Sequence, residues 1–287
     1  MFIIVLGAAG QLGTEIVKCL KNTKDIVRDF EHEDLDVTDP DAAGKTLSTL
    51  KPDCVINCTA YNRVDDASAN NETATKINFT AVENLAKICS NINSIFVHFS
   101  TDYVFNGKKG EPYAETDIPA PVNSYGISKL LGENSVAKNI FSHYVIRTSG
   151  VYGRGGSRQK GGNFIEAIIR KSKVQPELKV VNDQTVCPTY AKDLAETACK
   201  LIRTDRFGLY HITNSGACTW YEFACAIVDI ARLNCKVTPI TSAEYPQIAL
   251  RPKYSVLANN NLAKAGIAPM RHWKEALAEY LQVASSE

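Results

Sequence analysis

Three glycines at Gly-x-x-Gly-x-x-Gly spacing constrain this chain most, because they follow an apolar run and open a helical pattern. The run is Ile3–Leu6, and the glycines are Gly7, Gly10 and Gly13. With 17 glycines in 287 residues, chance would supply about 0.06 such matches. A turn without Cβ atoms lets the backbone approach a diphosphate, and the following helix offers free N–H groups. We therefore predict a dinucleotide-binding turn rather than a turn that only packs a helix on a sheet.

Short apolar runs alternate with helical patterns along the first half of the chain. Strands are predicted at Ile3–Leu6, Asp25–Phe30, Cys54–Cys58, Ile95–Ser100 and Tyr144–Thr148, and helices over 12–20, 40–50, 72–92 and 124–139. Continuous apolar strands separated by helices are typical of a parallel sheet that is covered on both faces. The predicted fold class is therefore α/β, with a doubly wound parallel sheet of the Rossmann type.

The pattern changes after Tyr152, where a glycine-rich basic loop covers residues 153–162. Beyond it we predict a loop over 182–190, a strand over 209–213, and helices over 163–173, 191–203, 219–232 and 272–283. We expect a dinucleotide-binding domain over residues 1–152, with a returning segment near 186–232. A smaller C-terminal α/β substrate-binding part would comprise residues 153–185 and 233–287.

Composition excludes several classes of protein. Lys plus Arg is 32 and Asp plus Glu is 31, so the net charge of +1 argues against non-specific nucleic-acid binding. No run of 18 apolar residues predicts a membrane span. The nine cysteines are odd in number and lack a Cys-x-x-Cys pair, which indicates reduced thiols in a cytoplasmic protein. The histidines lack metal-ligand spacing, so we expect no metal site.

A tyrosine and a lysine at i, i+4 spacing are the candidate catalytic pair. Tyr125 and Lys129 fall within the predicted helix 124–139 and share one face. A lysine ammonium beside a phenol would lower the pKa of the phenol. About 0.9 such pairs would occur by chance, so the spacing alone does not identify a catalytic pair. The position of the pair supports this role, because the helix follows the strand Ile95–Ser100 and should line the crevice at the carboxyl ends of the strands. Thr101 follows that strand directly. Its hydroxyl could bond a substrate carbonyl, or Thr101 could be a turn residue that bonds its own backbone.

The end of the second predicted strand bears on the choice of cofactor. Asp29 there would suit the ribose 2′-hydroxyl of NADH, whereas Arg28 could meet the 2′-phosphate of NADPH. The residues leave this choice open. Asp36 could bond an adenine amine or serve as a turn residue.

Taken together, these motifs resemble those of the extended short-chain dehydrogenase/reductases and, within that family, the dTDP-4-dehydrorhamnose reductases. The resemblance covers nearly the whole chain. It rests on Gly7/Gly10/Gly13, Ser100–Phe105, Tyr125–Glu133, Asp36–Thr38, Val55–Asn57 with Ala60 and Tyr61, Arg147–Ser149, Val181–Gln184 and Arg251–Pro252.

The resemblance implies a role for each site residue. The nicotinamide would give a hydride to C4 of dTDP-4-dehydro-L-rhamnose, Tyr125 would protonate the oxygen, Thr101 would hold it, and Lys129 would bond the ribose. The implied catalytic residues are Thr101, Tyr125 and Lys129. The implied cofactor-binding residues are Gly7, Gly10, Gln11, Leu12, Gly13, Asp36, Val37, Cys58, Thr59, Ala60, Tyr125 and Lys129. The implied substrate-binding residues are Thr101, Asp102 and Arg251.

Two departures from the family keep other hypotheses open. Gly150 stands where the family has Trp, and the basic loop carries Arg154, Arg158 and Lys160, which could clamp a diphosphate or be solvated. The chain could therefore reduce another nucleotide keto-sugar. It could also be a non-catalytic nucleotide-binding protein that resembles the regulatory subunit of methionine adenosyltransferase. The sequence leaves a homodimer open. We expect His98 and Trp220 to be packing residues.

Overall fold

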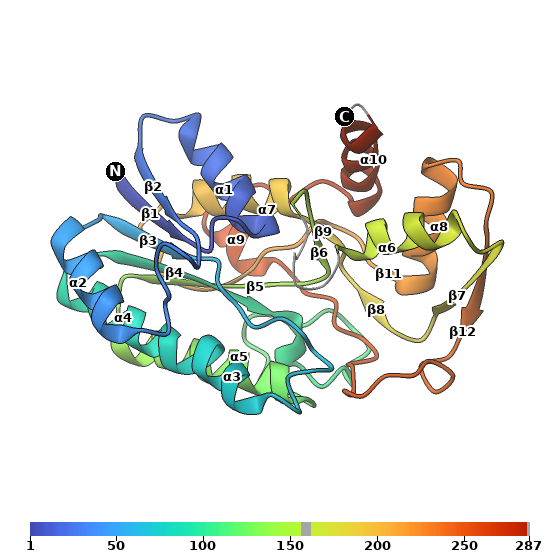
Figure 1. Cartoon of the computed structure of the whole chain (residues 1–287), viewed down its shortest axis with the longest axis horizontal. Helices are drawn as coiled ribbons and strands as arrows, with labels where there is room; N and C mark the ends of the chain where they lie inside the picture. The colour runs from blue at the N-terminus through green and yellow to red at the C-terminus, as the bar shows by residue number, and fades with distance from the viewer. Residues whose placement is uncertain (156–161, 286–287) are drawn as a thin grey trace.

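The structure is a computed structural model that describes residues 1–155 and 162–285, with side chains to residue 283. A large part contains a sheet between helices, and a smaller part lies beside it (Figure 1). The strands are β1 Phe2–Leu6, β2 Ile26–Phe30, β3 Cys54–Asn57, β4 Ile95–Thr101, β5 His143–Thr148, β6 Val151–Tyr152, β7 Glu177–Val181, β8 Thr185–Val186, β9 Thr189–Tyr190, β10 Gly208–His211, β11 Cys218–Thr219 and β12 Lys236–Ile240. The helices are α1 Gln11–Lys21, α2 Pro40–Leu50, α3 Asn71–Thr75, π-helix η1 Lys76–Thr80, α4 Ala81–Asn91, 3₁₀-helix η2 Asp102–Val104, α5 Ser124–Asn139, α6 Phe164–Ser172, α7 Ala191–Leu201, α8 Trp220–Ile230, α9 Asn260–Lys264 and α10 Trp273–Ser285.

The large part is built on a six-stranded sheet in the order β10-β5-β4-β3-β1-β2. Every neighbouring pair in it is parallel. This confirms the predicted doubly wound sheet. The chain runs from β1 outward to β2 and then returns to β3 on the other side of β1, so the strand order reverses between β1 and β3. A crevice for ligand is expected at the carboxyl ends of these two strands.

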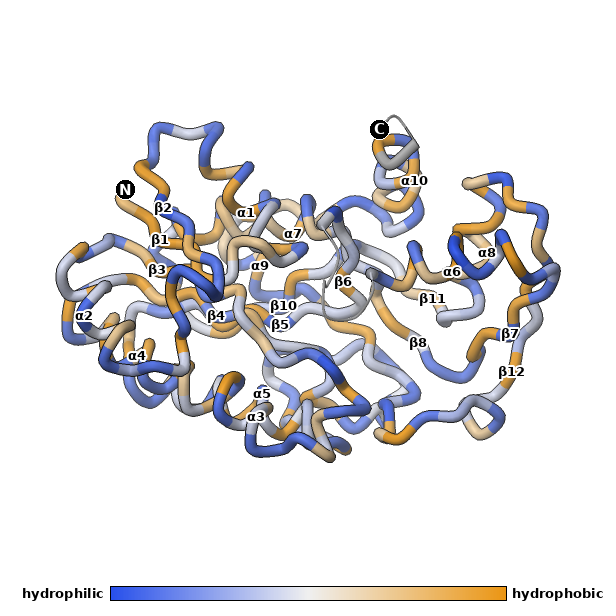
Figure 2. The backbone as a smooth tube through the Cα atoms, viewed as in Figure 1, coloured by the Kyte–Doolittle hydropathy of each residue, from blue (hydrophilic) through white to orange (hydrophobic). Residues whose placement is uncertain are grey.

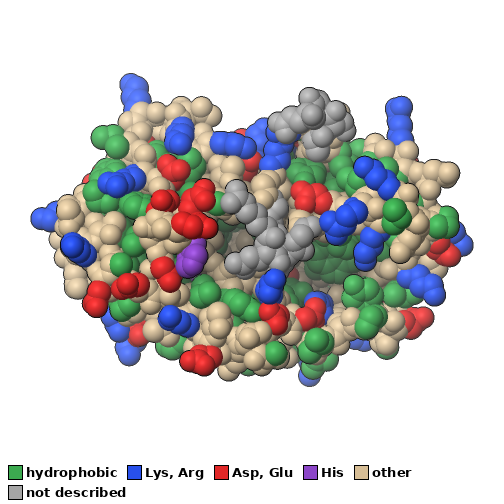
Figure 3. Space-filling model, in the orientation of Figure 1, with side chains coloured by type: hydrophobic (Ala, Val, Ile, Leu, Met, Phe, Trp, Pro, Cys, Tyr) green, Lys and Arg blue, Asp and Glu red, His purple; other side chains and the backbone are tan. Residues whose placement is uncertain are grey.

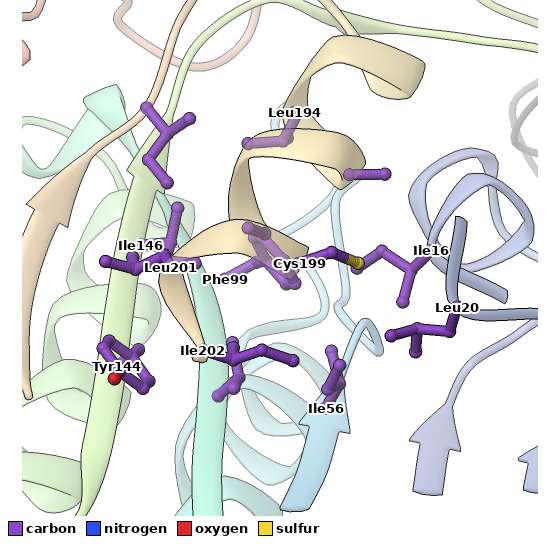
Figure 4. Close-up of a cluster of buried hydrophobic side chains, with 14 of the residues drawn as sticks. Ile16, Leu20, Ile56, Phe99, Tyr144, Ile146, Leu194, Cys199, Leu201 and Ile202 are labelled. Carbon is purple, nitrogen blue, oxygen red and sulfur yellow. The ribbon is translucent and has the colours of Figure 1, made fainter. Parts of the chain in front are cut away.

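Alternate residues of each central strand enter two separate cores. Ile3 and Val5 pack under α1 and α7, whereas Ile4 and Leu6 pack on the opposite face, under α2 and α4. Figure 4 shows the first core, where Ile16 and Leu20 of α1 meet Leu194 and Cys199 of α7 over the strands. The hydropathy colouring of Figure 2 places apolar residues along these strands. Both faces are buried, which explains the continuous apolar runs of the sequence.

A third core holds the smaller part together, where α6 and α8 pack over the parallel pair β7–β12 and α10 packs against α8 and β9. The stretch 182–190, expected to be a loop, contains β8 and β9, which pair with β11 and β6. The β7–β12 pair was not expected, because its strands lie far apart in the sequence.

Two helices pack in a different part of the molecule from the one expected for their residues. Helix α8 falls within the expected returning segment but packs in the third core, through Phe223 and Ile227. Helix α9 falls in the expected substrate part, but its Leu262 packs in the first core of the large part. No helix within the described ranges is long and apolar enough to cross a membrane.

Candidate active site

A cavity of about 920 Å³ lies at the carboxyl ends of the sheet strands, and we call it the central cavity. Its wall combines the glycine turn after β1, the segment after β3, the end of β4 and the first turns of α5. Phe164 and Trp220 close it from the smaller part. The site residues expected from the sequence that line it are Gly7, Gly10, Gln11, Leu12, Gly13, Asp36, Val37, Cys58, Thr59, Ala60, Thr101, Asp102, Tyr125 and Lys129.

The glycine turn has the geometry that a diphosphate requires. Gly7 has φ +75°, in the left-handed region, and a Cβ on Gly13 would lie 2.3 Å from the Gly7 carbonyl oxygen. Glycine is therefore needed at both positions. Gly10 caps α1 without a side-chain hydrogen bond, so the first N–H groups of α1 face the cavity unpaired by a cap. The Gln11 Oε1 atom is buried and has no partner among the described residues. This turn fits the diphosphate of a dinucleotide.

The mouth of the central cavity beside β2 is acidic. Glu31, Glu33 and Asp36 line it together with His32, and Figure 3 shows acidic side chains and one histidine at the rim of the hollow. Asp36 accepts a hydrogen bond from the Thr38 N–H at 2.9 Å. Neither Arg28 nor Asp29, the residues weighed in the sequence, is among those that line the cavity.

Tyr125 and Lys129 are fixed by the start of α5. The Asn123 Oδ1 atom accepts a hydrogen bond from the Gly126 N–H at 2.8 Å, which caps the helix. The Asn123 Nδ2 group donates to the Leu250 carbonyl at 2.7 Å, so the same side chain holds a loop of the C-terminal region. Tyr125 and Lys129 follow one turn apart and both face the central cavity.

The predicted lowering of the Tyr125 pKa is wrong for this structure. Burial raises the pKa of Tyr125 to about 12, although a hydrogen bond with Thr101 acts in the opposite direction. Lys129 is not among the groups that shift this pKa, and its Nζ atom donates to the Phe99 carbonyl at 2.6 Å. Burial also lowers the pKa of Lys129, to about 8. Tyr125 is therefore protonated at neutral pH, the state that a proton donor needs.

Thr101 and Asp102 form a buried hydroxyl–carboxylate cluster. The Thr101 hydroxyl accepts from the Tyr103 N–H and donates to Asp102, both at 3.1 Å. Asp102 also accepts from the hydroxyls of Ser149 at 2.9 Å and Ser255 at 2.5 Å. Burial raises the pKa of Asp102 to about 6. Asp102 thus connects the end of β4 to two distant segments as well as facing the cavity.

Arg251 lies outside the wall of the central cavity. Its guanidinium makes a two-pronged ion pair with Asp65, with nitrogen–oxygen distances of 2.6 and 3.0 Å. Asp65 also accepts from the backbone N–H of Ala249 at 3.0 Å. The pair therefore holds the loop that precedes Arg251. Arg251 is also close enough to the Tyr103 hydroxyl to hydrogen-bond it, and Tyr103 lines the cavity.

Aromatic residues of the smaller part are the main feature that sequence reasoning missed. Trp220, expected to be a packing residue, lines the cavity with Phe164, and their ring centroids are 4.7 Å apart. The only signal was their position at the start of two predicted helices. Gly150 also lines the cavity, with φ +53°. Arg154 donates to the Val283 carbonyl, whereas Arg158 and Lys160 lie outside the described residues. No group of three side chains able to hold a metal is found in residues 1–155 and 162–285.

Known proteins match this chain over nearly its whole length. It is 41% identical to the spore coat polysaccharide biosynthesis protein SpsK of Bacillus subtilis, over 99% of this chain and 98% of that protein. A crystal structure of a dTDP-4-dehydrorhamnose reductase from Clostridium acetobutylicum has a TM-score of 0.96 at 40% identity, covering 99% of this chain and 100% of that one. A dTDP-4-dehydrorhamnose reductase from Bacillus anthracis in complex with NADP has a TM-score of 0.94 at 35% identity, with the same coverage. The family described as RmlD substrate binding domain matches residues 1–286, and the chain belongs to that family.

Proposed function

We propose that this chain is an NAD(P)H-dependent oxidoreductase that reduces the C4 keto group of dTDP-4-dehydro-L-rhamnose to give dTDP-L-rhamnose. The observation that carries this proposal is the central cavity, which the glycine turn, Tyr125 and Lys129 line together. The relatives named as dTDP-4-dehydrorhamnose reductases support the substrate, and the one in complex with NADP supports the cofactor.

In the proposed mechanism, the bound nicotinamide supplies a hydride to C4 of the keto-sugar. The Tyr125 hydroxyl gives its proton to the developing alkoxide, since the phenol is protonated at neutral pH. The Thr101 hydroxyl, one hydrogen bond away from Tyr125, holds that oxygen once its proton turns from Asp102 to the substrate. The Lys129 amine faces the same space and binds the ribose. One keto group, one hydride and one proton thus give one alcohol.

The remaining site residues have proposed roles that follow from their positions. The diphosphate would lie on Gly10, Gln11 and Leu12 at the start of α1, with Gly7 and Gly13 allowing its approach. Asp36 and Val37 would contact the adenosine, and Cys58, Thr59 and Ala60 would border the cofactor after β3. We propose that Asp102 contacts the sugar directly, and that Arg251 acts on it through Tyr103.

We propose that the large part binds the dinucleotide and that the smaller part binds the nucleotide-sugar. The expected boundaries are 1–152 with 186–232 for the first and 153–185 with 233–287 for the second, except that α8 packs with the smaller part and α9 with the large part. A cytoplasmic location is supported by the free cysteines, and the absence of a nucleic-acid partner by the net charge of +1. A homodimer stays a prediction that sedimentation of the purified protein would test.

The test follows NAD(P)H absorbance with dTDP-4-dehydro-L-rhamnose as substrate. We expect rapid oxidation by the wild type and loss of turnover in Tyr125→Phe, which keeps the ring but lacks the proton. Tyr245→Phe, at an exposed position, is the matched control and should keep full activity. Turnover retained in Tyr125→Phe would contradict the role of Tyr125. No oxidation of either cofactor, by a protein that binds NADPH, would contradict reduction of this substrate and would point to another keto-sugar or to a regulatory role.

A second candidate is the same reduction on another nucleotide keto-sugar. Gly150 favours it, because a position where the family has Trp here has no side chain facing the cavity. The ratio of kcat/KM for dTDP-4-dehydro-L-rhamnose and for its D-gluco isomer distinguishes the two. The non-catalytic alternative is not favoured, since the catalytic side chains all line one cavity.

A further inference from the structure

A buried histidine lies directly against the catalytic lysine. His98 belongs to β4 and is fully buried. Its Nε2 atom is 3.3 Å from the Lys129 Nζ atom, and its Nδ1 atom is 3.4 Å from the Nδ2 atom of Asn57 on the neighbouring strand β3. Both of its ring nitrogens therefore have polar partners, although the proposed mechanism gives His98 no role.

The orientation of the Asn57 amide is fixed independently of His98. Its Oδ1 atom accepts from the Thr59 backbone N–H at 3.0 Å and from the Thr59 hydroxyl at 2.6 Å. Two donors can be satisfied only by the oxygen, so the NH₂ group must face His98. The His98 Nδ1 atom is consequently the acceptor of that contact.

A neutral imidazole carries a single proton, so Nδ1 as acceptor leaves the proton on Nε2. His98 is neutral, because burial first and the charge of Lys129 second lower its pKa well below the usual value. The Nε2–H group thus points at the Lys129 Nζ atom. An ammonium has only donors, whereas a neutral amine has the lone pair that this N–H requires.

The other groups around Lys129 leave the contact with His98 to decide whether the lysine is charged or neutral. Glu133, one turn along α5, favours the charged lysine, but it is itself held by Arg147 of β5 at 2.6 Å. Tyr125 lies one turn earlier and is neutral, and Asp102 of η2 is bonded to three hydroxyls. The Phe99 carbonyl accepts a hydrogen bond from either form of Lys129.

We propose that His98, oriented by Asn57, is a positioning residue that directs its Nε2–H group at Lys129 and stabilises the neutral amine formed when Lys129 returns a proton to Tyr125. In that step an N–H bond of the ammonium breaks and the O–H bond of Tyr125 re-forms. The lysine then regains a proton from solvent. The catalytic consequence rests on the proposed function, whereas the placement of the histidine proton does not.

The first test reads the proton on His98 directly. In the ¹⁵N-labelled wild type with NADP⁺ bound, the chemical shifts of the two ring nitrogens distinguish the tautomers. With five histidines in the chain, each ring can be assigned. We expect His98 to carry its proton on Nε2 across the range of pH where the enzyme is active. A proton on Nδ1, or a doubly protonated ring, would overturn the proposal even if the enzyme were fully active.

The second test changes the tautomer without altering His98. In Asn57→Asp the carboxylate can keep both Thr59 contacts and accept a proton from Nδ1, so Nε2 becomes an acceptor that favours the ammonium. We expect the alkaline limb of the kcat profile to move up by about one pH unit. His98→Phe, which removes the N–H but keeps a ring, should move it in the same direction and lower kcat at neutral pH.

His143→Phe removes a histidine from another strand of the same sheet and is the matched control. A purely structural role would lower stability without moving the alkaline limb, and that result would contradict the proposal. If the wild type does not turn over dTDP-4-dehydro-L-rhamnose, the proposed function fails, while the tautomer measurement still decides the placement of the proton.

Discussion

Asp102 shows how burial makes one side chain sensitive to pH. Its usual pKa lies near 4, and burial raises the pKa to about 6 in the folded chain. The folded state therefore holds this proton more tightly than the unfolded state. The resulting stabilisation is complete below about pH 4 and is lost as the pH rises through 6.

We expect the free energy of unfolding of the wild type to fall between pH 4 and pH 7 by up to about 3 kcal/mol more than that of Asp102→Asn. Urea titrations at several pH values measure this difference. Asp229→Asn, which alters an exposed carboxylate, is the control and should behave as the wild type. Parallel curves for the wild type and Asp102→Asn would contradict the prediction.

The acidic mouth beside β2 predicts a preference between the two cofactors. Glu31, Glu33 and Asp36 line it, and Lys76 is the lysine among the described lining residues whose charge acts on Asp36. A 2′-phosphate bound near these carboxylates would be repelled. We expect the double variant Glu31→Gln, Glu33→Gln to bind NADPH about fivefold more tightly, with little change for NADH. Titration of cofactor fluorescence gives both constants. Glu83→Gln on α4 is the control, and an equal gain for both cofactors would exclude the electrostatic explanation.

At the scale of elements, the contact between α5 and η1 holds the catalytic helix against the sheet. A Cβ on Gly132 would lie 2.3 Å from the Asn78 backbone oxygen, whereas a Cβ on Gly44 of α2 meets only Ile88, at 3.9 Å. Both glycines are helical, so alanine should stabilise by about 0.5–1 kcal/mol wherever space allows. We expect Gly44→Ala to raise the melting temperature and Gly132→Ala to lower it and to reduce kcat. A gain in stability in both variants would contradict this prediction, because it would show that α5 and η1 can move apart to make room for a Cβ atom.

Sequence patterns predicted the elements whose ends carry local signals. Helices 40–50 and 124–139 have the predicted bounds, because Asp39 and Asn123 cap them with their own side chains. The predicted helix 72–92 is interrupted by η1, where the Asn78 side chain bonds both backbone groups of Tyr61. No local pattern reveals such a tertiary contact.

Sequence reasoning misplaced Arg251 and Trp220 for the same physical reason. The residues that line the central cavity from the large part belong to motifs, so the sequence predicts them. Arg251 meets Asp65 across 186 residues of chain, and Trp220 faces the cavity only because α8 packs against α6. Spacing along the chain carries no information about either contact.

At the scale of the whole molecule, the two parts are interleaved rather than consecutive. After β7, β8 and β9, the chain returns as α7 and β10 to cover one face and one edge of the large sheet before β11 and β12. Helix α7 contributes Leu194, Ala195, Ala198 and Leu201 to the first core. The large part therefore lacks a closed core without residues from the second half of the sequence.

We expect a fragment of residues 1–152 to be unfolded, since the apolar face under α7 would be exposed to water. The full chain should unfold in a single calorimetric transition that NADP⁺ moves upward as a whole. A fragment with cooperative unfolding, or two separate transitions of the full chain, would contradict this prediction.

The side chain of Asn123 has a consequence for redesign of the enzyme. It caps the helix that bears Tyr125 and also bonds the Leu250 carbonyl in a loop distant in sequence. A designer who exchanges that loop to recruit a new sugar therefore also changes the cap that holds Tyr125, the proposed proton donor. Grafts that keep the carbonyl of residue 250 in place should retain their chemistry, whereas grafts that shift it would lose rate on every sugar alike.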